Sequence, residues 1–220
     1  MVPDAAQATW IAVVGSDAAG DAVVALVAGS NVTAQAQASH ALIDLTKRAS
    51  TLDFTGVKAQ RVLSGDKVAS AIRDYLLIGA LLTAAEAVGS TSACLAGIVD
   101  YLKTRKQFGK LIGSFQALKH PTVDIYVGME HSRSLVYHAS SEIDDGPLST
   151  EAEVACRMAK AKASDTIQYA GDRSVQFHGG FGFTWECDSS LFIRRAAWSQ
   201  QQFGDAMHHR KRLAPLLLDA

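Results

Sequence analysis

The chain is poor in features that mark several common protein classes. Only three of its 220 residues are cysteine, an odd number without a CxxC pair, which argues against a disulfide framework and favours reduced, structural thiols. The formal net charge is −1, and without a basic excess nothing indicates a nucleic-acid partner or a membrane surface. The seven histidines have no metal-ligand spacing, so no metal site is expected.

Long hydrophobic runs are also absent. The longest, YLLIGALLTAA at residues 75–85, lies between Asp74 and Glu86, whereas a membrane span needs about 18 apolar residues. This run is predicted to be a buried helix. The first residues include Asp4 and no basic segment, so no signal peptide is expected and the predicted location is the cytoplasm.

The first 66 residues are predicted to form short strands. TWIAVVGS (9–16) and AVVALVAG (22–29) flank the turn-rich DAAGD, which predicts a hairpin. VTAQAQAS (32–39) alternates apolar and polar residues, and LDFTGVKAQRVL (52–63) predicts one more strand. So few strands would leave sheet edges unpaired, which indicates part of a larger architecture or a surface for a partner.

Helical periodicity begins near residue 67. We expect four long helices, at about 68–104, 115–144, 150–176 and 189–217. Short loops between them favour an antiparallel bundle, and Thr150 with Glu153 forms a capping-box pattern at the start of the third helix. The predicted fold class is α+β, mainly α. It consists of a small partial β-sheet over residues 1–66 and an antiparallel four-helix bundle over residues 67–220.

A cationic stretch, RKQFGK at residues 105–110, follows the first predicted helix. The guanidinium of Arg105 suits a phosphate or diphosphate, Phe108 can lie against a flat ring, and Gly109 allows the backbone to turn. The alternative interpretation is a solvated helix C-terminus, with its cations placed favourably on the helix dipole.

A glycine-rich stretch, QFHGGFGFTWE, follows the third predicted helix. Gln176 can hydrogen-bond an amide or phosphate, and Gly179 and Gly180 allow a ligand to approach the backbone closely. The alternative is a helix–helix loop packed by phenylalanines. The stretch is not a GxGxxG after a strand, so it is not the usual dinucleotide fingerprint. His120 and His178 are interpreted as hydrogen-bonded structural residues.

Taken together, YLKTRKQFGKLIGSFQALKH, QFHGGFGFTWE and the later FIRRA resemble the C-terminal helical domain of acyl-CoA dehydrogenases. GFTWE and FGDAMHHRKRLA are most similar to the actinobacterial branch, where steroid-side-chain and related enzymes often pair two unlike subunits. The resemblance covers the chain from about residue 68 to the end. It extends more weakly to the first 66 residues, where VPDAAQATWIAVV resembles the middle β-domain.

The resemblance implies that these segments bind FAD across a subunit interface. Arg105 would face the diphosphate of an FAD seated mainly on the neighbouring subunit. The remaining implied cofactor-binding residues are Gln107, Phe108 and Gln116, which would help to hold the cofactor, and Gln176, Gly179 and Gly180, which would contact its adenosine and diphosphate side.

The family reaction needs a base, which this chain lacks at the expected positions. A glutamate removes the α-proton of an acyl-CoA while a hydride passes from the β-carbon to the flavin. The resemblance places that glutamate at one of two positions, which here hold Gly204 and Gly79. Asp205 is a weak substitute. Glu86 is seven residues beyond Gly79, which places it about 10 Å further along the helix. That distance is too great for it to reach the same α-carbon.

Three hypotheses follow. The leading one is a flavoprotein subunit or fragment that completes the FAD site of a complete acyl-CoA dehydrogenase-like partner, which supplies the base and takes the acyl-CoA. The second is a self-sufficient, homo-oligomeric dehydrogenase with Asp205 as an atypical base. The third is a non-catalytic structural or assembly subunit. The residues do not identify the acyl group, and they leave open whether the chain is itself an enzyme.

Overall fold

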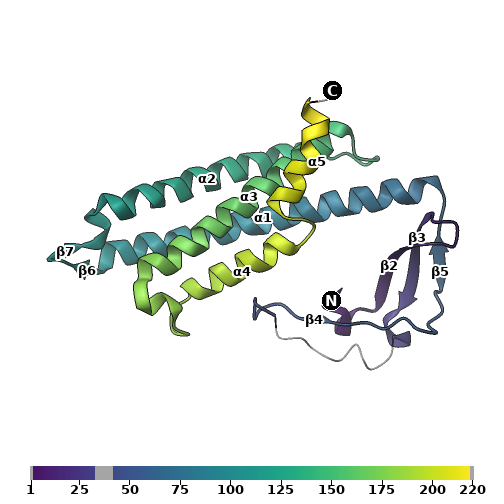
Figure 1. Ribbon diagram of the computed structural model, residues 1–220, viewed down its shortest axis with the longest axis horizontal. Helices are drawn as coiled ribbons and strands as arrows, with labels where there is room; N and C mark the ends of the chain where they lie inside the picture. Colours follow the sequence, from purple (N-terminus) through teal and green to yellow (C-terminus); the bar gives the residue numbers. More distant parts are fainter. Residues whose placement is uncertain (1, 33–41, 219–220) are drawn as a thin grey trace. The chain divides into compact units, whose positions relative to one another are not determined.

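The computed structural model describes residues 2–32 and 42–218 (Figure 1). Two compact units divide the chain, residues 1–75 and 76–220. The boundary between them falls within the first long helix, α1 (Asp66–Thr104), which begins where helical periodicity was expected to begin.

The first unit contains short strands and two single-turn helices. They are β1 (Val2–Pro3), η1 (Ala5–Gln7), β2 (Trp10–Ser16), β3 (Ala22–Ala28), η2 (Gly29–Asn31), β4 (Ala49–Ser50) and β5 (Arg61–Leu63). β2 and β3 pair antiparallel along their full length, which confirms the predicted hairpin, and β5 adds to the other edge of β3. A small core forms around Ile11, Val27 and Val32.

The predicted strand at 52–63 is wrong for most of its length, because only its last three residues pair, as β5. Upstream of β5, the carboxylate of Asp53 accepts hydrogen bonds from the backbone and hydroxyl of Thr55, which bends the chain into a turn. The predicted strand at 32–39 lies almost wholly within residues 33–41, outside the described residues.

The second unit is a helical bundle. Its elements after α1 are β6 (Lys106–Gln107), β7 (Lys110–Leu111), η4 (Ile112–Ser114), α2 (Gln116–Ser141), α3 (Thr150–His178), η5 (Gly179–Phe183), α4 (Ser189–Gln201) and α5 (Ala206–Leu218). α1, α2 and α3 lie side by side and alternate in direction, with α4 and α5 against α3 (Figure 1). The predicted helical bundle with a small sheet before it is confirmed.

One helix prediction needs correction, because residues 189–217 do not form a continuous helix. The chain breaks between α4 and α5, where Phe203 and Gly204 both have positive φ, 55° and 95°. A smaller correction concerns α3. Ser149, not Thr150, caps it by accepting a hydrogen bond from the amide of Ala152 at 3.1 Å.

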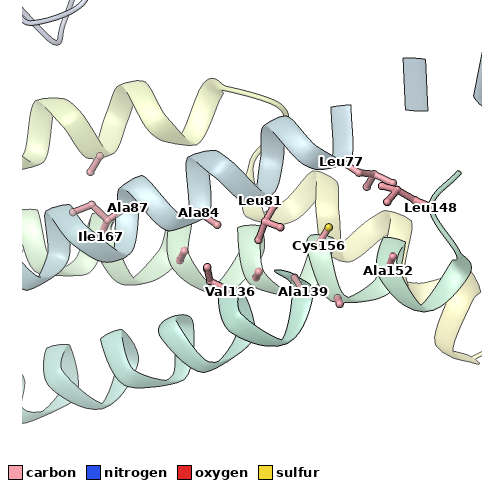
Figure 2. Close-up of a cluster of buried hydrophobic side chains, with 14 residues drawn as sticks. Leu77, Leu81, Ala84, Ala87, Val136, Ala139, Leu148, Ala152, Cys156 and Ile167 are labelled. Carbon is pink, nitrogen blue, oxygen red and sulfur yellow. The ribbon is translucent and has the colours of Figure 1, made fainter. Parts of the chain in front are cut away.

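Small residues let α3 pack at the centre of the bundle. A Cβ added to Gly171 would lie 2.8 Å from the Cα of Ile193, so glycine is what allows α3 and α4 to approach so closely. Figure 2 shows a core cluster in which Leu77, Leu81 and Ala84 of α1 face α2 and α3. All three cysteines are buried and free.

The run at residues 75–85 is helical, as predicted, but only one face of it is buried. Leu77, Ala80, Leu81 and Ala84 are in the core, whereas Leu82 is 66 % exposed. Among the described residues, α1 is the one helix long and apolar enough to cross a membrane. A core helix of a bundle meets the same criterion, and α1 contributes residues to the core from Leu77 to Leu102.

Candidate functional site

A pocket of about 750 Å³ lies where the end of α1 meets the end of α3. It is lined by Tyr101, Arg105, Gln107, Phe108, Ile112, Phe115, Leu118 and residues 176–181. The two motifs, 66 or more residues apart in sequence, therefore meet around one space. Six of the seven residues expected to bind a cofactor line it. The seventh, Gln116, is exposed at the start of α2 and is not among the lining residues.

A tight hairpin holds the cationic motif beside the pocket. The amide of Ile112 donates to the carbonyl of Arg105 at 2.9 Å, and Gln107 pairs with Lys110 across the hairpin. Its two turn residues, Phe108 and Gly109, both have positive φ, as a two-residue hairpin loop that matches strand twist requires. The guanidinium of Arg105 is exposed and forms no hydrogen bond or ion pair within residues 2–32 and 42–218, so its donors remain available to a ligand.

Three glycines follow the end of α3, at positions 179, 180 and 182, and a different reason explains each of them. Gly179 has φ 63° and ψ −144°, a conformation that other residues rarely adopt. A Cβ on Gly182 would lie 2.6 Å from the carbonyl oxygen of Val175, so packing within the chain requires that glycine. Gly180 has no positive φ, and nothing lies within 4 Å of where its Cβ would be. No backbone angle or contact of the described residues requires glycine at position 180. Close approach of a ligand to the backbone would require it.

Among the aromatic residues that sequence reasoning did not assign to the site, Tyr101 and His178 line it as a stacked pair. Tyr101 lies one helical turn before Arg105, and its ring stacks on the imidazole of His178 with 4.1 Å between centroids. His178 Nδ1 lies 2.7 Å from the carbonyl oxygen of Ser174 and 2.8 Å from Ser189 Oγ. The prediction that His178 is hydrogen-bonded is confirmed, whereas the same prediction for His120 is wrong, because its exposed side chain forms no hydrogen bond within the described residues. Tyr101 is four residues before Arg105, about one helical turn, and this spacing could have predicted that both face the same site.

Large apolar side chains are exposed near the pocket. Phe108 is 88 % exposed, and downstream of the glycines Phe183 and Trp185 are 80 % and 71 % exposed. Phe108 also has a backbone conformation that costs a bulky residue about 1–3 kcal/mol. The hairpin turn accounts for this backbone conformation, but apart from an edge contact with Phe115 the phenyl ring is left exposed to solvent. Exposed aromatic clusters of this kind are typical of protein–protein interfaces.

A second place of interest is the loop between α4 and α5, which carries one of the two positions where the resemblance implied a base. The ring of Phe203 covers the other position, since a Cβ added to Gly79 would lie 2.2 Å from Phe203 Cε1. The two positions are thus spatial neighbours. A side chain at 79 would require the Phe203 ring to move, and φ of 95° disfavours a side chain at 204.

Two buried polar side chains hold this loop in place. Lys160, fully buried in α3, donates to Ser164 Oγ at 2.9 Å and to the carbonyl oxygens of Ser199 and Gly204 at 3.1 and 2.9 Å. His209 Nε2 lies 3.0 Å from the carbonyl oxygen of Phe203. All three ammonium donors of Lys160 are therefore used, and the loop is fixed through its backbone.

Burial shifts the pKa values of both groups. Desolvation lowers the pKa of Lys160 to about 8, opposed by the negative charge of Asp205. Desolvation also lowers the pKa of His209 to about 4, with further lowering from the positive charges of Lys160, Arg157 and His208. The neutral form of His209 is consequently the one that fits the folded chain.

The carboxylates considered as substitute bases have other partners. Asp205 Oδ1 accepts a hydrogen bond from the amide of His208 at 2.7 Å, which satisfies a donor in the first turn of α5. Glu86 Oε1 lies 2.5 Å from Arg195 Nη1 in an ion pair between α1 and α4.

Comparisons with known proteins agree with the motifs. The family model "Acyl-CoA dehydrogenase, C-terminal domain" matches residues 69–215. The acyl-CoA dehydrogenase IpdE2 of Mycolicibacterium smegmatis is 39% identical over 134 residues, which cover 61% of this chain and 40% of that protein. The chain therefore spans well under half the length of this curated relative.

Two solved structures have a similar fold. A chain in the structure of the electron transferring flavoprotein of Acidaminococcus fermentans has a TM-score of 0.86 at 26% identity, covering 99% of this chain and 59% of that one. A chain of the ChsE4–ChsE5 complex from Mycobacterium tuberculosis has a TM-score of 0.79 at 23% identity, covering 97% and 56%. Because the family model matches well over half of its residues, the chain belongs to the acyl-CoA dehydrogenase family, of which it contains the C-terminal helical domain.

Proposed function

We propose that this chain completes an FAD site across a subunit interface in an acyl-CoA dehydrogenase-type flavoprotein, while a partner subunit supplies the glutamate base. The observation that carries the proposal is the single pocket that unites the free guanidinium of Arg105 with the open backbone at Gly180. When bound, FAD would accept the hydride in the α,β-dehydrogenation of an acyl-CoA. The acyl-CoA would reach the site through the complex.

The residues around the pocket fit a nucleotide with a diphosphate. Arg105 offers a planar fork of donors and fixed positive charge, which suits phosphate oxygens. Gln107 and Gln176 add amide groups, and Phe108 adds a ring that can lie against a flat heterocycle. Gly179 and Gly180 leave the end of α3 uncovered, so the cofactor can contact the backbone directly.

Binding in trans is supported by the exposed aromatic residues near the pocket. The rings of Phe108, Phe183 and Trp185 would be removed from water by a second subunit at the cofactor. ChsE4–ChsE5, which has a similar fold, is a complex of two named chains. The partner would be a complete acyl-CoA dehydrogenase-type subunit or, in a homo-oligomer, a second copy.

We propose that this chain carries no catalytic base, and the argument rests on the loop between α4 and α5. Glycine occupies both expected positions, and the Phe203 ring fills the space beside Gly79. The rival, a self-sufficient enzyme with Asp205 as base, would have to use Oδ2, since Oδ1 already accepts a hydrogen bond from the amide of His208. The two glycines, and not this bond, carry the proposal that a partner supplies the glutamate.

Co-expression tests the proposal. The chain is produced with an acyl-CoA dehydrogenase-type partner, and the purified complex is assayed for bound flavin and for bleaching by acyl-CoA. Arg105→Ala should weaken FAD binding at least about 10-fold, since a charge-assisted hydrogen bond contributes about 1.5–3 kcal/mol. Lys106→Ala is the matched control, because Lys106 is an adjacent exposed cation that does not line the pocket.

Each outcome selects one hypothesis. If Arg105→Ala leaves flavin content and turnover unchanged, the proposal is wrong. Loss of turnover in Asp205→Asn, with a flavin-containing enzyme formed by this chain alone, would favour the self-sufficient dehydrogenase. A folded chain that never acquires flavin with any partner would favour an assembly subunit.

A further inference from the structure

We infer that His178 recognises a ribose hydroxyl of the adenosine half of bound FAD, through its Nε2 atom acting as a hydrogen-bond acceptor. This inference rests on the proposed function. It assigns a ligand-binding role to a residue that sequence reasoning treated as structural only.

The chain's own hydrogen bonds determine which ring nitrogen carries the proton. The carbonyl oxygen of Ser174 can only accept, so the Nδ1 atom 2.7 Å from it must be the N–H donor. In the neutral ring, Nε2 then carries a lone pair and can only accept. The tautomer of His178 is thereby fixed from within the protein, before any ligand binds.

The same contacts fix where Nε2 lies. Ser174 and Ser189 hold the Nδ1 edge, and Tyr101 stacks on the ring face at 4.1 Å, so the ring cannot turn freely. Nε2, on the opposite edge, has no hydrogen-bond partner within residues 2–32 and 42–218. Since Nε2 is unpaired and is not fully buried, it keeps some exposed surface. His178 is one of the residues that line the pocket, and we take Nε2 to be the atom that it offers to a ligand there.

The pocket therefore pairs two kinds of recognition. Arg105 provides donors and positive charge for phosphate, whereas His178, with a proton on Nδ1, provides at Nε2 an acceptor that a phosphate cannot satisfy. The ligand group that complements Nε2 must carry a proton to donate. In the proposed binding mode, residues 176–180 face the adenosine side of FAD, where the donors beside the diphosphate are the ribose hydroxyls.

The test compares FAD with two analogues that lack the 2′- or the 3′-hydroxyl of adenosine, bound to the flavin-free complex of this chain and its partner. The wild-type complex should bind FAD about five-fold more tightly than at least one analogue, as expected for one neutral hydrogen bond. His178→Phe keeps a ring beside Tyr101 and removes the acceptor. It should bind FAD about five-fold more weakly and bind FAD and that analogue equally.

Ser189→Ala is the matched control. It removes a hydroxyl from the Nδ1 edge, leaves Nε2 and the Ser174 carbonyl in place, and should retain discrimination between FAD and the analogue. A role of His178 in anchoring α4 alone would give both variants the same binding pattern.

The outcomes separate this inference from the proposed function. Equal binding of FAD and both analogues by the wild type overturns the inference, whether or not His178→Phe folds. Discrimination that survives in His178→Phe overturns it as well. If Arg105→Ala weakens FAD binding and His178→Phe does not, only the role of His178 is lost. If neither variant affects FAD, the proposed site itself is wrong.

Discussion

The buried imidazole of His209 should make the chain sensitive to mild acid. His209 is 2 % exposed, and its pKa is lowered from 6.5 to about 4 by burial and by nearby positive charge. The folded chain therefore binds this proton more weakly than the unfolded chain does. The corresponding stability is fully present above pH 6.5 and is lost as the pH falls from 6.5 towards 4.

The size of the effect follows from the two pKa values. At about 1.4 kcal/mol per pH unit, the full difference amounts to about 3 kcal/mol, of which about 2 kcal/mol is lost between pH 7 and pH 5. His209→Gln should reduce this loss by about 2 kcal/mol, because the amide Nε2 still donates to the carbonyl of Phe203 but does not titrate.

Urea unfolding of wild type and variant at pH 7 and pH 5 measures the difference. The comparison uses the change between the two pH values, so a lower starting stability of the variant does not affect it. His120→Gln, which replaces an exposed imidazole on α2, should lose as much stability as the wild type. Equal losses in wild type and His209→Gln would refute the assignment of His209 as a neutral, buried group.

Three further predictions concern the site and its support. Gly180→Ala should leave the melting temperature within about 2 °C of wild type, because its Cβ meets no atom of the chain, yet weaken flavin binding about 10-fold in a fluorescence titration. Lys160→Met should lower the free energy of unfolding by about 3 kcal/mol in urea, because the Gly204 carbonyl loses its ammonium donor and the Ser199 carbonyl keeps only the amide of Gln202, whereas the exposed Lys211→Met should change it by less than about 0.5 kcal/mol. Gly79→Ala should destabilise by about 2 kcal/mol by calorimetry, and Phe203→Ala in the same chain should restore part of that loss, since the two side chains compete for one space.

Most of the bundle could be predicted from periodicity, because long apolar patterns leave little choice. α1 and α3 begin and end within two residues of the expected positions. The break between α4 and α5 could not be predicted in this way. Gly204 is an isolated glycine in a helical pattern, and the loop's carbonyls are bound by Lys160, 44 residues away in sequence, and by His209 of the next helix.

Some residues of the candidate site could be predicted from the sequence, and others could not. The resemblance and the residue chemistry together identified Arg105 and the glycines, which the structure brings to one pocket. The stacking of Tyr101 on His178 depends on how α1 packs against α3, which no local pattern contains. Gln116 was assigned from the family resemblance, and it lies at the exposed start of α2, outside the residues that line the pocket.

The Phe203 ring over Gly79 also limits how this chain can evolve. A mutation that placed glutamate at 79 would collide with that ring, and one at 204 would have to adopt an unfavourable φ. Any route to an independent proton acceptor at either place requires the aromatic ring and the loop to change together. The proposed dependence on a second polypeptide for the base would, once the ring occupied that space, be hard to reverse by stepwise substitution.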